Sequence, residues 1–465
     1  MKNTVIPKLI STLRGGLALL LLAALLQSCD NFTETGLPPG QLASAAVFED
    51  KSTATAAILD IYAKLRDVGI LSGIPTGLSS QLGSYADELD FYGEATNGTR
   101  LFYNNALVAS NTDVSDWWAN SYNGIYAANA VIEGLAASES IKTEDKAALT
   151  GEALFVRALL HFYLVNLYGG VPYIDTTDYR QNQVAARQSE DAVYIKIIAD
   201  LERAIDYLPD TEFPSKTRPN RAAATALLAR AYLYHGDWEE ASNAASAVLN
   251  TGNYLMEDNI DNVFLKDSES TIWQLSPQGD GINTNEGVTF IFNSGPPPYV
   301  ALTNVLLDAF EPGDLRRSHW IAAVTGESGV WYHANKYKEQ TNTDSSVEYS
   351  IILRVAEQYL IRAEARAQQG ELIGAIEDLN VVRNHAGLGN TTANGKEQLL
   401  DAIQRERRAE FFTEQGHRFF DLKRTGTIDA ALSFKPGWNA TDKLLPIPEA
   451  DLLMNTNLAP QNPGY

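Results

Sequence analysis

Histidines are the residues of this 465-residue chain best suited to acid–base or metal chemistry at neutral pH. No two of the six stand four residues apart, so the H-E-x-x-H zinc motif is absent from the sequence. A G-x-S-x-G nucleophile motif is absent as well. We therefore expect the histidines to pack in the interior or lie at the surface. They are His161, His235, His319, His333, His385 and His417.

Carboxylates are the second source of possible chemistry. The 58 acidic residues could include a catalytic pair, but their number singles out no pair, so a secreted carboxylate-dependent hydrolase stays open. Two groups could offer oxygen ligands to calcium, and neither has the spacing of an EF-hand loop. We expect no cofactor, and a structural calcium ion has no support in the spacing. The two groups are Asn283 with Asn285 and Glu286, and Asn342 with Asp344 and Glu348.

Cys29, the only cysteine, offers covalent attachment of lipid. Three basic residues precede an apolar run at residues 15–26, which is shorter than the roughly 20 residues that span a bilayer. This order predicts a lipoprotein signal peptide over residues 1–28, with Cys29 as the lipidated first residue of the mature chain. An ordinary signal peptide beside an unpaired thiol is the alternative. The prolines in residues 29–40 predict a flexible tether.

The composition indicates a folded, acidic protein. The formal net charge is −22, and all the charged side chains that are removed with residues 1–28 are basic. Such an excess of negative charge repels phosphate backbones, so we expect no nucleic-acid partner. With 45% hydrophobic and 20% charged residues, the remainder of the chain is typical of a globular domain, which we place at residues 41–465.

Helical periodicity dominates this domain. Apolar residues recur every three or four positions in long segments, and two later segments each predict a helix, a glycine turn and a second helix. Small alanines recur where the paired helices would touch, which is typical of tetratricopeptide-like repeats. The predicted helices are 53–67, 117–135, 144–167 and 192–208, and the pairs are 222–235 with 239–250 and 352–369 with 373–384.

Two loop-rich insertions, at about 69–111 and 254–350, separate the helical segments. Gly, Pro, Asn and Ser are frequent in the second, which also contains strand-like pieces at 271–275 and 288–292. Long loops in compact proteins usually carry function, so we expect ligand specificity to lie in these two insertions.

Arginines, carboxylates and phenylalanines alternate near the C-terminus. Two interpretations are open: buried arginine–carboxylate pairs that clamp helices together, or a charged ligand pocket. We favour the structural interpretation because the neighbouring aromatic residues are spaced as core positions. The charged residues are Arg405, Arg407, Arg408, Glu410, Arg418, Asp421 and Arg424.

Several of these segments resemble the SusD/RagB family. The C-terminal signature spans about 403–465 and includes IQRERRAEFF at 403–412, GHRFFDLKRTG at 416–426 and KLLPIPE at 443–449. The segment EALFVRALLHFYLVNLYGGVPYI at 152–174 is similar to the family's central helix and turn. Together with the lipoprotein signal that ends at Cys29, the resemblance covers essentially the whole chain.

The resemblance implies a mainly α-helical, tetratricopeptide-like scaffold whose loop-rich insertions form the ligand-binding face. It implies an outer-membrane lipoprotein of Bacteroidetes that faces the cell exterior. It further implies capture of glycans, as oligo- or polysaccharides, and their delivery without catalysis to a SusC-type TonB-dependent transporter. A RagB-like peptide-capturing protein is one alternative. A hydrolase and a purely structural assembly protein are the others.

Within that framework, loop aromatics are the candidates for the ligand site. Sugar rings present apolar C–H faces that stack on aromatic rings, while polar side chains bind the hydroxyls. Trp331 is a further possibility outside the candidate set, and Trp117, Trp118, Trp238 and Trp273 are expected in the core. The candidate ligand-binding residues are Phe91, Tyr92, Arg100, Tyr103, Tyr299 and Trp320.

Overall fold

The computed structural model describes residues 44–94, 97–211 and 213–465, and the chain divides into two units, 1–47 and 48–465. In the first unit the only described element is α2 (Ser44–Val47). The predicted signal peptide, Cys29 and the tether lie outside the described residues.

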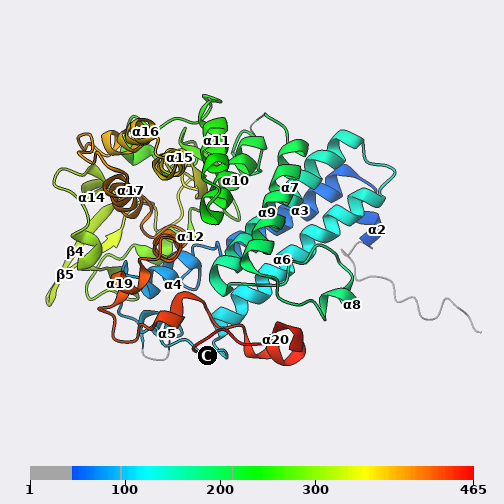
Figure 1. Cartoon of the computed structure of the whole chain (residues 1–465), viewed down its shortest axis with the longest axis horizontal. Coiled ribbons are helices and arrows are strands. Elements are labelled where there is room, and N and C mark those ends of the chain that lie inside the picture. Colours follow the sequence, from blue (N-terminus) through cyan, green and yellow to red (C-terminus); the bar gives the residue numbers. More distant parts are fainter. Residues whose placement is uncertain (1–43, 95–96, 212) are drawn as a thin grey trace, which may run out of the picture. The chain divides into compact units, whose positions relative to one another are not determined.

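Long helices that pack on one another form the scaffold of this unit (Figure 1). They are α3 (Lys51–Asp67), α6 (Thr112–Ala137), α7 (Thr143–Tyr168), α9 (Glu190–Tyr207), α10 (Arg221–His235), α11 (Trp238–Leu249), α15 (Val355–Gln369), α16 (Leu372–His385), α17 (Lys396–Phe411) and α18 (His417–Arg424). Each helix packs on the next one in the series α6, α7, α9, α10, α11, α15, α16 and α17. The helices predicted from periodicity and the mainly helical, tetratricopeptide-like fold are confirmed.

The two predicted helix pairs have matching turns. Gly236 ends α10 with φ 94°, and Gly370 ends α15 with φ 84°. Glycine has no Cβ to clash in this left-handed conformation, so it can end each helix and reverse the chain. The alanines expected at the helix contacts are fully buried, as Ala231 and Ala245 illustrate, so the helix axes can approach closely.

Helix α7 is the central core helix. By length and hydropathy it could cross a membrane, but 89% of its most apolar window is buried inside the protein. A helix that is apolar all round is buried on all sides, either in lipid or in a large core. Here the neighbours are α6 and α9, so the apolar surface of α7 is covered by protein.

The two insertions contain short elements. Residues 69–111 contribute α4 (Leu78–Tyr85), β1 (Leu89–Phe91) and α5 (Thr99–Tyr103). The second insertion and its C-terminal border contribute η2 (Ile260–Asn262), β2 (Thr271–Leu275), α12 (Asn285–Phe290), β3 (Val300–Leu302), α13 (Asn304–Leu307), α14 (Leu315–His319), β4 (Ile321–Gly326), β5 (Gly329–Ala334) and β6 (Ser350–Arg354). The described strands form three antiparallel two-stranded sheets, β1–β3, β2–β6 and β4–β5.

One predicted strand is confirmed and one is wrong. The piece at 271–275 is β2, and all five of its residues are buried. The piece at 288–292 was expected to be extended, but helix α12 covers Asn285–Phe290. Thr284 explains the difference, since its Oγ1 accepts a hydrogen bond from the Gly287 backbone at 3.1 Å and caps the helix. The remaining described elements are α8 (Tyr179–Asn182), α19 (Ile428–Leu432), η3 (Ala440–Lys443), α20 (Glu449–Met454) and η4 (Thr456–Leu458).

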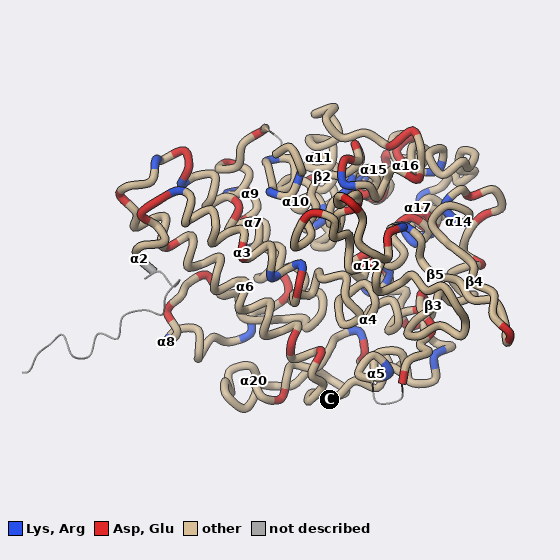
Figure 2. Tube along the Cα trace, turned by 180° about the vertical axis from the view of Figure 1, so that it is seen from behind, with Lys and Arg blue, Asp and Glu red and all other residues tan. Residues whose placement is uncertain are grey.

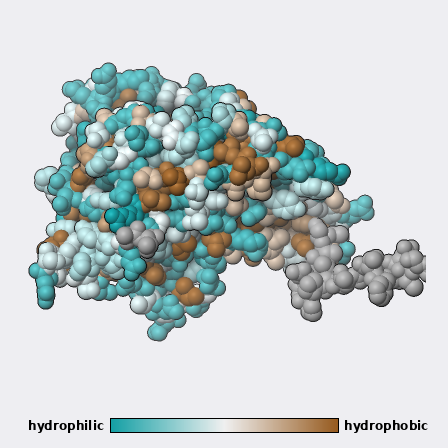
Figure 3. Space-filling view, turned by 90° about the horizontal axis from the view of Figure 1, so that it is seen from below, coloured by the Kyte–Doolittle hydropathy of each residue, from teal (hydrophilic) through white to brown (hydrophobic). Residues whose placement is uncertain are grey.

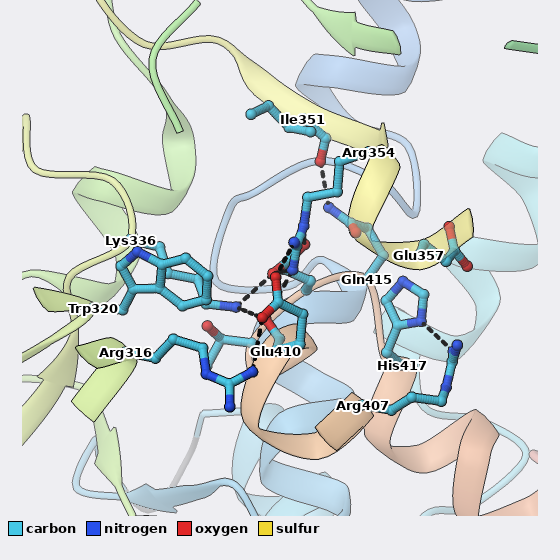
Figure 4. Close-up of polar contacts among 12 residues, drawn as sticks. Arg316, Trp320, Lys336, Ile351, Arg354, Glu357, Arg407, Glu410, Gln415 and His417 are labelled. Carbon is cyan, nitrogen blue, oxygen red and sulfur yellow. Dashed lines mark hydrogen bonds and ion pairs between the residues drawn. The ribbon is translucent and has the colours of Figure 1, made fainter. Parts of the chain in front are cut away.

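The charged residues of the C-terminal signature form a buried network, which Figure 4 shows around Glu410. The Glu410 carboxylate accepts hydrogen bonds from Arg354 and from Arg316, the latter at 2.9 Å. Arg354 also donates to Glu414 at 3.0 Å, and Lys336 donates to the Glu410 backbone carbonyl at 2.7 Å. Burial raises the pKa of Glu410, but the two guanidinium groups outweigh it and hold the pKa at about 2.

Most other charges of the signature are paired in the same way. Figure 2 shows acidic and basic positions close together along α14, α15 and α17. Arg405 is the exception, because it is exposed to solvent. The structural interpretation of the alternating charges is therefore confirmed for the paired residues. The pairs are Arg407 with Asp421, Arg424 with Asp421 and Glu364, and Arg408 and Arg418 with Asp87.

Candidate functional site

Strands β1 and β3 bring together residues that are 209 to 213 positions apart in the chain. Phe91 pairs with Val300 in the antiparallel register, and the Tyr92 backbone N–H donates to the Tyr299 carbonyl at 2.7 Å. Directly opposed residues in an antiparallel pair have close side chains. The sheet therefore places three of the candidate residues, Phe91, Tyr92 and Tyr299, beside one another. We call the surface around them the aromatic face.

Tyr299 is held in place by its ring and its hydroxyl. The ring meets Phe91 edge-on, with centroids 5.7 Å apart. The hydroxyl shares a hydrogen bond with Thr99 Oγ1 and donates to the Pro75 carbonyl at 3.2 Å. Burial raises the pKa of Tyr299, so the phenol stays protonated at neutral pH. These contacts position the ring before any ligand arrives.

Tyr103 extends the aromatic face from α5. Its hydroxyl donates to Asp90 Oδ1 at 3.3 Å, and the Lys435 ammonium lies 5.3 Å from its ring centroid. Lys435 is itself buried and donates to the carbonyls of Ser84 and Ala86 at the end of α4. Burial lowers the pKa of Lys435 to about 7. Asp90 and Tyr103 thus add polar groups beside the rings.

Trp331 on β5 completes the aromatic face, and sequence reasoning left it out of the candidate set. Burial and the Asp90 carboxylate raise the pKa of Tyr92, and the neighbouring Trp331 opposes this shift. Gly295 leaves room for the indole, since a Cβ there would lie 2.2 Å from Trp331 Cζ3. The sequence shows Trp331 and Gly295 only as separate positions in the second insertion. The fold brings the two segments together.

A groove of about 340 Å³ adjoins Tyr299. Tyr299, Val288 on α12 and the proline-rich loop at 293–298 contribute apolar surface. Asn293 and Gln340 contribute amides, and the Asn293 amide donates to Gln340 Oε1 at 2.8 Å. Apolar surface with a few fixed polar groups is typical of small-molecule sites. The groove and the aromatic face share Tyr299 and together form the candidate site.

The structure does not bring the other two candidate residues into this surface in the expected way. Trp320 is fully buried, with its indole N–H donating to the Ile260 carbonyl at 3.2 Å, so the expectation that it contacts ligand is corrected to a core role. Trp320 supports the site through the core, because it belongs to the same buried cluster as Val300 and Leu302 on β3. Arg100 on α5 is exposed, with no ion-pair partner among the described residues.

The chemistry available at this site is stacking and hydrogen bonding. Rings of Tyr92 and Trp331 can pack on the C–H faces of a sugar, and nearby amides and hydroxyls can bind its hydroxyl groups. Among residues 44–465, apart from the three positions not described, no group of three or more His, Cys, Asp or Glu is placed to hold a metal ion. The arrangement is that of a binding surface.

Comparison with known proteins decides the family. A family described as starch-binding and associating with the outer membrane matches residues 49–233, and the SusD family matches residues 316–465. SusD-like protein P2 of Formosa agariphila is 30% identical over 502 residues, covering 95% of this chain and 97% of that protein. The chain belongs to the SusD/RagB family. Members of this family are carbohydrate-binding proteins and not enzymes.

Solved structures of SusD-like proteins share the fold. A laminarin-binding SusD-like protein superposes with a TM-score of 0.76 at 27% identity, covering 89% of this chain and 99% of that chain. Surface glycan-binding protein A from Bacteroides fluxus superposes with a TM-score of 0.73 at 23% identity, covering 90% and 100%. The second likeness, at this low identity, concerns the fold alone.

Proposed function

We propose that this SusD/RagB member captures glycans at the aromatic face and the adjoining groove, and passes them uncleaved to a SusC-type TonB-dependent transporter. The observation that carries the proposal is the meeting of Tyr92, Tyr299 and Trp331 beside a groove with fixed amides. Stacking rings with neighbouring hydrogen-bonding groups match the two faces of a sugar. The starch-binding family model and the laminarin-binding relative support the same ligand class.

We also propose that Cys29 anchors the protein by lipid in the outer membrane, facing outward. The basic and apolar residues before Cys29 support a lipoprotein signal. A Cys29→Ala variant should leave the membrane fraction and appear in the soluble fraction, because it lacks the thiol that would carry the anchoring acyl chains. Full retention of that variant in membranes would overturn the proposed anchor.

The binding experiment uses the intact chain in a detergent without a sugar headgroup. Calorimetric titration against polysaccharides, their oligosaccharides and peptides tests the ligand class, and each mixture is analysed for cleavage products. Saturable binding of an intact glycan, weakened in Tyr92→Ala, supports the proposal. Cleavage would instead indicate a hydrolase, and binding of peptides alone would indicate a RagB-like peptide-capturing protein.

The transporter partner needs its own test. Hydrophobic residues lie in several separate patches among hydrophilic ones on the face seen in Figure 3. Leu453 and Met454 on α20 are among the exposed large apolar residues. These patches do not by themselves define a docking surface. Affinity purification of the tagged, membrane-anchored chain should co-purify a TonB-dependent transporter. Recovery of the chain free of any transporter under mild solubilisation would count against the partner.

A further inference from the structure

A second pocket lies apart from the proposed glycan groove and shares no lining residue with it. Its volume is about 110 Å³, several times the roughly 10–15 Å³ that one water requires. Arg66 and Asp67 line it from the end of α3, Leu275 from β2, and Glu286 from α12. Val288 of the same short helix lines the groove, so α12 contributes to both cavities.

Glu286, which lines this pocket, has a buried carboxylate oxygen without a hydrogen-bond partner among the described residues. The side chain is only 3% exposed, and its Oε1 accepts a hydrogen bond from Ser350. Its Oε2 has no hydrogen-bond partner. A buried carboxylate oxygen without a partner costs about 1–3 kcal/mol or more, so such oxygens normally bind water or a ligand. The 110 Å³ pocket is the larger of two spaces that Glu286 lines.

The backbone around Glu286 keeps the carboxylate in position. A Cβ on Gly73 would lie 2.2 Å from Glu286 Oε2, so only glycine leaves room for the carboxylate here. Thr289 Oγ1 donates to the Gly73 carbonyl at 2.7 Å and ties α12 to this segment. On its other side Glu286 borders a void of about 10 Å³, too small for anything but one water. Of the two spaces beside Glu286, only the 110 Å³ pocket has room for a ligand larger than one water.

Charges around the pocket favour a neutral ligand that donates hydrogen bonds. Arg66 and Asp67 neutralise each other through a two-point hydrogen bond, both distances being 2.6 Å. Burial, with help from Glu348 and Glu414, raises the pKa of Glu286 to about 7. An anion would face these carboxylates without a free cation. Leu275, Pro277 and the Tyr349 ring supply apolar walls.

We propose that this pocket is a second binding site, which holds one neutral sugar residue or a small polyol of similar size through a hydroxyl donated to Glu286. The apolar walls and Tyr349 would contact C–H groups of the same molecule. The inference rests on the proposed glycan-binding function for its ligand class. The proposed second site differs from the glycan groove in its position and in its lining residues.

The test uses monosaccharides alone (glucose, galactose, mannose and N-acetylglucosamine) with the intact chain. Binding is measured by calorimetry and located by soaking crystals in each sugar. We expect sugar density within hydrogen-bond distance of Glu286 Oε2. We also expect a loss of affinity of about tenfold or more in Glu286→Leu, since a hydrogen bond to a charged group is removed. A pocket that holds only water in every soak would overturn the proposal.

Two further variants keep the result interpretable. The double variant Tyr92→Ala/Tyr299→Ala should lose glycan binding at the groove and keep monosaccharide binding at Glu286, so failure of one site is distinguishable from failure of the other. Should Glu286→Leu not fold, Glu286→Gln provides the second measurement. The wild type should bind more tightly as the pH rises through about 7, because an ionised carboxylate is the stronger acceptor, and Glu286→Gln should not. An equal pH response in both proteins would contradict a role for Glu286.

Discussion

The ion-pair network around Glu410 and the aromatic face at β1 and β3 use similar residues in opposite ways. In the network, aromatic rings surround charges that are fully paired, as where the Lys336 ammonium lies 4.0 Å from the Phe412 centroid. On the aromatic face, Tyr92 is 41% exposed, and Arg100 on α5, outside that face, is exposed with no ion-pair partner among the described residues. The first region holds helices together, whereas the second keeps rings and polar groups available to a ligand.

The difference shows how one fold can separate stability from recognition. Buried charges must be paired, so every partner in the network constrains the others. The aromatic face rests on that constrained interior, since Phe91 and Tyr299 pack against the core cluster that contains Trp320 and Phe412. Changes in the network should therefore affect folding, and changes on the face should affect binding.

The largest expected effect comes from breaking the network at Glu410. Glu410→Ala would leave Arg316 and Arg354 buried without this shared carboxylate, which should destabilise the protein by about 3–5 kcal/mol. Urea unfolding followed by circular dichroism measures the loss. Arg405→Ala on the same helix is the matched control, because Arg405 is exposed, and its effect should stay within about 0.5 kcal/mol. Equal stability of the two variants would show that the network does not support the fold.

The helical scaffold is the part that sequence could predict. Helices α10, α11, α15 and α16 follow from periodicity, buried alanines and the glycines that end α10 and α15, all of which are local signals. Burial of the charged C-terminal signature was predictable for a related reason: its phenylalanines occupy core spacing. The predicted start at 352 was less accurate, because residues 350–354 form strand β6 before α15 begins.

The candidate site was predictable only in part. Its loop aromatics stood out by residue type, and the three prolines at 296–298 directed attention to Tyr299. The pairing of β1 with β3 and the packing of Trp331 on Gly295 depend on contacts between distant segments, which no local pattern encodes. Trp320 follows an exposed-looking polar stretch, yet its large ring fills the core beneath β3.

A smaller effect is expected from Glu88, which lies between the two regions. Burial raises its pKa to about 7, with Asp87 adding to the shift. Between pH 4.5 and 7 the folded state keeps a proton that the unfolded state has released, so stability falls as pH rises through this window. Glu88→Gln removes this dependence. Its stability relative to wild type should increase by on the order of 1–3 kcal/mol from pH 5 to 7.5, measured by urea unfolding at each pH. A constant difference would mean that Glu88 is ionised throughout.

Next comes Tyr92→Ala, which tests the aromatic face without disturbing the network. Loss of a stacking ring should weaken glycan binding by about 1 kcal/mol, while the unfolding free energy changes little because Tyr92 is half-exposed. Tyr179→Ala is the matched control, since Tyr179 on α8 is 69% exposed and belongs to neither region. Titration with the glycan identified in the panel compares the two variants. An equal loss in both would place the ligand elsewhere.

The smallest effect is expected at Arg100, where the two regions can be compared most directly. An arginine of the network, such as Arg354, is buried and bound to Glu410 and Glu414, so its removal should unfold the protein. Arg100 is exposed and unpaired among the described residues, so Arg100→Ala should change the unfolding free energy by less than about 0.5 kcal/mol. If its guanidinium binds sugar hydroxyls, affinity should fall by about 0.5 kcal/mol, the lower end of what one hydrogen bond contributes, because the contact is exposed to water. Unchanged affinity would confine the site to the rings and the groove, and a loss of stability would show that Arg100 has a structural partner.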